Sequence, residues 1–85
     1  MNIIFKSTKG ITHTLVANYG TTIDQLLKAY LFNINKPFLY DEPNRISFLF
    51  NGSILKFGDQ TPVENFFKSP NPTIKVIVTQ ALMSG

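Results

Sequence analysis

Hydrophobic and polar residues alternate at the start of the chain, and this pattern predicts a β-hairpin. Ile3 and Phe5 fall on the same side of a strand over residues 2–8, because successive side chains of a strand point to opposite faces. Gly10 can take the positive φ that a tight turn requires. A second strand over residues 11–17 then returns antiparallel to the first.

The spacing of apolar residues next changes to three and four, which predicts an amphipathic helix from residue 23 to about residue 33. Either Thr21 or Thr22 can cap its N-terminus, and Asp24 lies in the first turn, where negative charge is favoured. Pro37 prevents the helix from continuing. The apolar stripe of this helix consists of Ile23, Leu26, Leu27, Tyr30 and Leu31.

The second half of the chain predicts three more strands and a short helix. Residues 45–50 alternate again, and the Asn-Gly pair at 51–52 indicates a tight turn into a short strand at 54–55. The Thr-Pro-Val-Glu sequence at 61–64 is typical of a helix start, with Thr as the N-cap and Glu three residues later. Residues 73–79 form the last strand.

This order of elements predicts an α+β fold in one domain. A mixed sheet of four to five strands, with one main helix packed across it and one short helix, buries both apolar surfaces in a single core. The segment at 61–68 is too short for a second full helix, which argues against a split RNA-binding fold. The domain is expected to cover residues 1–80, followed by a short tail at 81–85.

Composition and charge narrow the functional classes. The chain has no Cys, so it has neither disulfides nor a thiol nucleophile, and an intracellular location with the cytoplasm as default is expected. The net charge of +3 is spread without a basic stripe and includes one Arg, so no nucleic-acid partner is expected. The apolar runs are too short to span a bilayer, so no membrane insertion is expected.

The residues with catalytic chemistry do not form a recognisable set. His13 is the only His, and no Ser-His-Asp or Cys-His arrangement accompanies it. Asp41, Glu42 and Asp59 fall in connections, where carboxylates are usually solvated or cap turns. The sequence therefore predicts no enzyme activity, no catalytic residues, no metal site and no cofactor.

The chain resembles the ubiquitin-like family over nearly its whole length, and that family has the β-grasp fold. The matching residues near the N-terminus are Met1, Ile3, Lys6, Gly10, Thr12, Thr14, Leu15, Thr22 and Ile23. Those of the later strand-turn-strand segment are Phe50, Gly52 and Leu55. Residues 61–64 resemble the capped short helix of the family, and residues 74–78 resemble its last strand. A long connection at residues 34–44 departs from the family pattern.

The resemblance implies a non-enzymatic protein that binds other proteins through its surface. The apolar recognition patch of the family would fall on Thr8, Leu49 and Ile77, with Gly52 and Lys75 beside it. The first of these positions is usually Leu in the family, so the patch is only partly kept. We therefore expect an interaction or structural module, either a small subunit or a domain of a larger assembly, with protein partners.

An alternative function concerns the C-terminal glycine. Some ubiquitin-like proteins are covalent modifiers or sulfur carriers that act through such a residue, which here would be Gly85. Against this, the chain has no Gly-Gly pair at its end and no basic residue among positions 80–85.

The connection at 34–44 carries an aromatic and aliphatic cluster, Phe38, Leu39 and Tyr40, with two possible roles. The loop could fold over the edge of the core and bury these side chains. They could instead form an exposed patch for a protein partner, since contiguous apolar surface marks interaction sites and aromatic residues dominate their energy.

Overall fold

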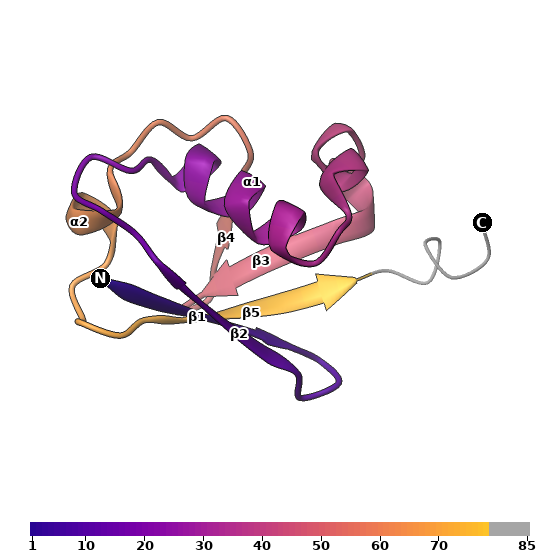
Figure 1. Cartoon of the computed structure of the whole chain (residues 1–85), viewed down its shortest axis with the longest axis horizontal. Helices are drawn as coiled ribbons and strands as arrows, with labels where there is room; N and C mark the ends of the chain where they lie inside the picture. The colour runs from indigo at the N-terminus through magenta and orange to yellow at the C-terminus, as the bar shows by residue number, and fades with distance from the viewer. Residues whose placement is uncertain (79–85) are drawn as a thin grey trace.

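The computed structural model describes residues 1–78 and has an α+β architecture: a five-stranded mixed sheet with the main helix across one face (Figure 1). The elements are β1 (Asn2–Ser7), β2 (Thr12–Val16), α1 (Ile23–Asn33), η1 (Pro37–Asp41), η2 (Pro43–Arg45), β3 (Ile46–Phe50), β4 (Ser53–Leu55), α2 (Val63–Phe66) and β5 (Thr73–Val78). The predicted α+β class, the mixed sheet of four to five strands and the two helices are confirmed. The predicted domain boundary at residue 80 and the tail at 81–85 lie outside the described residues.

The strand order is β2-β1-β5-β3-β4, so the first and last strands lie side by side at the centre. β1 pairs antiparallel with β2 and parallel with β5. β3 pairs antiparallel with both β5 and β4. In the described part of the chain, no helix is long and apolar enough to cross a membrane.

The core lies between the sheet and α1, where alternate strand residues meet the apolar stripe of the helix. Phe5, Tyr30 and Phe48 form its aromatic centre. The rings of Phe5 and Tyr30 stack with centroids 4.3 Å apart, and Phe48 meets both edge-on at 6.2 and 5.8 Å. Such pairs add about 0.5–1.5 kcal/mol beyond area burial. Burial raises the pKa of the Tyr30 hydroxyl.

The turn between β3 and β4 explains why Asn and Gly stand at positions 51 and 52. Asn51 has a φ of 51° and Gly52 a φ of 80°, and two successive positive φ values match the twist of a two-residue hairpin. The turn fixes the register, with Phe50 opposite Ser53 and Leu49 opposite Ile54. The hairpin predicted at this point is therefore confirmed.

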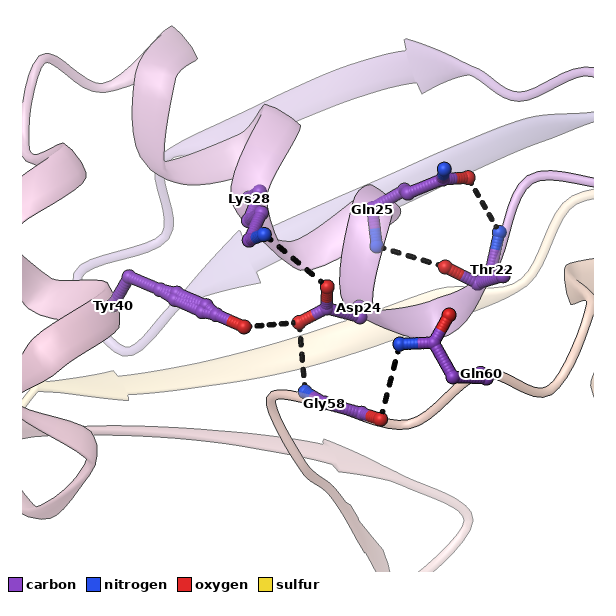
Figure 2. Close-up of polar contacts among 7 residues, drawn as sticks. All are labelled: Thr22, Asp24, Gln25, Lys28, Tyr40, Gly58 and Gln60. Carbon is purple, nitrogen blue, oxygen red and sulfur yellow. Dashed lines mark hydrogen bonds and ion pairs between the residues drawn. The ribbon is translucent and has the colours of Figure 1, made fainter.

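The start of α1 follows the prediction, and the start of α2 does not. Thr22 caps α1 in a reciprocal pair with Gln25, at 3.1 and 3.0 Å (Figure 2). The expected box of Thr61 and Glu64 is absent, because α2 begins at Val63 with Pro62 as its N-cap and no side-chain cap.

Backbone groups of Thr61 and Val63 form hydrogen bonds with the segment that leads into α1. The Thr61 carbonyl accepts the N–H of Ile23 at 2.9 Å, and the Val63 N–H donates to the Thr21 carbonyl at 2.8 Å. The carboxylate of Glu64 accepts the Gly20 N–H at 3.0 Å. The entry to α2 is therefore tied to the entry of α1, which prevents the local capping box from forming.

Candidate functional site

The face of the sheet opposite α1 carries an apolar group that no helix of residues 1–78 covers. Ile4, Leu49 and Ile77 project from three neighbouring strands and are half-buried. The β3–β4 register adds Ile54, which stands opposite Leu49 and is 61% exposed. We call this surface the open face and define it by Ile4, Lys6, Leu49, Ile54, Lys75 and Ile77.

Strand pairing places two positive charges within this apolar group. Lys6 of β1 stands directly opposite Lys75 of β5, and Lys75 stands opposite Leu49 of β3. Like charges at opposite positions of a sheet are destabilising unless another group compensates them. Among residues 1–78, neither lysine forms an ion pair.

The acidic residues lie elsewhere in the fold. All five belong to helices or connections, namely Asp24, Asp41, Glu42, Asp59 and Glu64. Every charged residue on a strand is therefore a lysine, Lys6 or Lys75. Within residues 1–78, the open face therefore combines apolar side chains with positive charge that no acidic side chain pairs with.

The structure brings the predicted recognition residues together only in part. Leu49, Lys75 and Ile77 belong to the open face. Thr8 is exposed and lines a shallow depression of about 370 Å³ with both lysines. Gly52 lies in the turn at the end of the β3–β4 hairpin and has a conformational reason to be glycine.

The sequence analysis did not identify Ile54 as part of this surface. Counting outwards from the turn places it opposite Leu49.

The connection at 34–44 folds back onto the body of the protein. Leu39 is completely buried and belongs to the core, so it presents no side-chain surface to a partner. The Tyr40 ring is half-buried and stacks on Phe57, with centroids 4.9 Å apart. Phe38 remains 47% exposed. Of the two roles considered for this cluster, packing therefore describes Leu39 and Tyr40, whereas Phe38 stays available at the surface.

A buried carboxylate holds this connection in place (Figure 2). Asp24 Oδ1 accepts hydrogen bonds from the Tyr40 hydroxyl at 2.8 Å and from the Gly58 N–H at 2.7 Å. Asp24 Oδ2 lies 3.4 Å from Lys28 Nζ, which also lies 4.5 Å from the centroid of the Tyr40 ring. The carboxylate is thus satisfied on both oxygens.

The pKa of Asp24 follows from these contacts. Burial on its own would raise this pKa, but hydrogen bonds from Gly58 and Tyr40, together with the Lys28 ammonium, outweigh burial and hold it below its ordinary value. A catalytic acid near neutral pH requires the opposite shift. Asp24 is therefore suited to stabilising the fold and unsuited to acid catalysis.

His13 has the surroundings of a packed side chain. It is half-buried on β2, and its ring meets Tyr30 edge-on at 6.0 Å. Within residues 1–78, no three His, Asp or Glu side chains lie close enough together to hold a metal ion.

Comparison with known proteins assigns neither a family nor a function to this chain. No model of a known family matches the chain, and a search of curated proteins finds no match.

Proposed function

We propose that this chain is a ubiquitin-like β-grasp domain that works as a non-enzymatic protein-interaction or structural module, with its partner docked on the open face. The fold assignment is supported by the element order: an opening hairpin, a helix across the sheet, and a last strand parallel to the first. Within the described residues, the contacts of Asp24 and His13 are those of structural groups, which agrees with a function in binding.

The observation that carries this proposal is the continuity of the open face across the sheet. Lys6, Lys75 and Leu49 are successive cross-strand neighbours, and Leu49 is in turn opposite Ile54. Apolar side chains that reach the surface beside one another, as those of Leu49 and Ile54 do, mark interaction sites in globular proteins. The face therefore combines apolar side chains with two lysines in one cross-strand row, so a partner can make both apolar and charged contacts with it.

The charges define the chemistry of the partner. A protein surface with apolar side chains against Leu49 and Ile54, and with carboxylates against Lys6 and Lys75, would relieve the repulsion between the two lysines and accelerate association. The open face presents no aromatic ring, which single-stranded nucleic acids use as a stacking platform. We therefore propose an acidic protein partner.

Substitution on the open face tests the proposal. Ile54→Asp places a charge at an exposed position, and Leu49→Asp places one at its cross-strand neighbour. Phe32→Asp is the matched control, since Phe32 is an exposed apolar residue of α1. Circular dichroism would confirm that each variant remains folded.

The binding experiment is a tagged pull-down under native and denaturing lysis, followed by affinity measurements on the protein identified by mass. We expect both open-face variants to bind it at least about tenfold more weakly and Phe32→Asp to bind normally. Equal affinity in all three variants would remove the open face from the proposal. Conjugation through Gly85, which lies outside the described residues, stays a prediction. Adducts that survive denaturation and disappear when Gly85 is deleted would support it.

A further inference from the structure

Strand β2 forms one edge of the sheet, and its outward backbone groups face no other strand of the described residues. The Ala17 N–H donates to the Met1 carbonyl at 2.8 Å, and the Ser7 N–H donates to the Ile11 carbonyl at 2.9 Å. Hydrogen-bonded pairs alternate along an antiparallel ladder, so the odd-numbered residues of β2 bond to β1. The N–H and C=O groups of the even-numbered residues Thr12, Thr14 and Val16 therefore point away from the sheet.

This edge lacks the features with which proteins usually prevent strand association. Natural edge strands are short, or carry Lys, Pro or a bulge. β2 contains no Lys, Arg, Asp, Glu or Pro, and it pairs with β1 in continuous register. The opposite edge, β4, is only three residues long.

Apolar side chains are also unusually exposed along this edge. Val16 is 74% exposed, and Ile11 and Tyr19, which flank the strand, are 57% and 83% exposed. The edge therefore combines an unpaired backbone with uncovered apolar surface.

We propose that β2 pairs antiparallel with β2 of a second copy of this chain, about a two-fold axis at Thr14. Thr14 then stands opposite Thr14 of the partner subunit, and Thr12 opposite the partner's Val16. Every outward N–H and C=O of the even-numbered residues gains a hydrogen bond in this register. Cross-strand pairs of Thr are themselves favourable.

The charges of the chain are compatible with this pairing. Lys6 of β1 stands opposite Thr12, so in the paired sheet it lies in one row with Thr12, the partner's Val16 and the partner's Asn2. The two copies of Lys6 thus occupy different rows, and no like charges face each other. The pairing uses the backbone of β2, which contributes no residue to the open face, so this inference does not depend on the proposed function.

The interface is small, because five residues pair on each side. We therefore expect a reversible dimer with a dissociation constant between about 10 µM and 1 mM. Sedimentation equilibrium of the whole chain should show a mass that rises from 9.6 kDa towards twice that value. A mass that stays at 9.6 kDa at about 2 mM chain would overturn the proposal.

Amide exchange provides a residue-level test with an internal control. The N–H groups of Thr14 and Val16 should exchange more slowly as the concentration of the chain rises. Those of His13 and Leu15, which already bond to β1, should not change. If the exchange rates of the two sets of N–H groups respond equally to the concentration of the chain, the result would contradict pairing through this edge.

Two substitutions distinguish β2 from other contact surfaces. Thr14→Pro removes an outward N–H and no bond to β1, so an edge strand can accept it, while Thr14→Val keeps the N–H as the control. Val16→Lys introduces the charge that edges normally carry, with Ile54→Lys at the opposite edge as its control. Thr14→Pro and Val16→Lys should weaken dimerisation at least about tenfold. A dimer unaffected by Val16→Lys would refute the assignment even if Thr14→Pro failed to fold.

Discussion

The hydroxyl of Tyr40 donates a hydrogen bond to Oδ1 of Asp24 at 2.8 Å, across sixteen residues of sequence. The same carboxylate oxygen accepts the Gly58 N–H, from a third segment of the chain. A single buried side chain on α1 therefore holds both the connection at 34–44 and the loop after β4 against the helix.

Replacing Tyr40 with Phe should reduce the free energy of unfolding, because one hydrogen bond to a charged acceptor is lost while the ring keeps its stack on Phe57. Urea denaturation at neutral pH measures the change. Tyr19→Phe is the control, since Tyr19 is exposed, and should alter stability by less than about 0.5 kcal/mol. Equal effects of the two substitutions would show that the Tyr40 hydroxyl contributes nothing.

Acid should destabilise the protein through Asp24. The pKa of this carboxyl is lowered in the folded state from an ordinary value of 3.8, so its contribution to stability is complete above that value. The contribution is lost as the pH falls through the lowered pKa. Urea denaturation of the wild type and Asp24→Asn should give a stability difference that is constant near neutrality and narrows below about pH 4. A difference that does not change with pH would contradict the lowered pKa.

Gly52 should matter for stability whether or not it touches a partner. Its φ of 80° is strained for any residue with a Cβ, although a Cβ there would meet no atom within 4 Å. We expect Gly52→Ala to destabilise the fold by about 1 kcal/mol. If partner affinity under folding conditions is unchanged, the role of Gly52 is conformational. A loss of affinity without a loss of stability would assign it to the interface.

Charge reversal at Lys75 should separate binding from folding. Glu at this position would face Lys6 across the parallel pair and replace a like-charge contact with an attractive one, so the fold should not be weakened. We expect Lys75→Glu to slow association with the acidic partner about tenfold at low salt, with a smaller effect at high salt. Lys68→Glu, at an exposed lysine after α2, is the control. An identical rate for both variants would exclude an electrostatic role for Lys75.

The sequence predicts those parts of the fold that depend on local patterning. Alternation identifies the strands, the three-to-four spacing identifies α1, and Asn51 with Gly52 identifies the hairpin turn. Thr22 is one of the two caps considered for α1, and the structure confirms it. The start of α2 is wrong by one residue, because the backbone pairing between Thr61 and Ile23 joins segments that no local pattern relates.

In the candidate site, too, local patterning predicts some features, and pairing between distant segments decides the others. Leu49 and Ile77 could be placed on the face opposite the core from alternation alone. The cross-strand pairing of Lys6 with Lys75 could not, since it requires the parallel register of strands at the two ends of the described chain. Asp24 was expected to complement the helix dipole, whereas its partners Tyr40 and Gly58 are distant in sequence. Local chemistry therefore indicates which residues are available, and long-range pairing decides what they contact.

The central position of β5 has a consequence for biosynthesis. β5 separates β1 from β3, so the opening hairpin and the β3–β4 hairpin share no strand ladder until it is in place. During translation the nascent chain therefore cannot complete the sheet before Val78 has left the ribosome exit tunnel. Until then, β1 and β3 each present an unpaired side to chaperones and to neighbouring nascent chains.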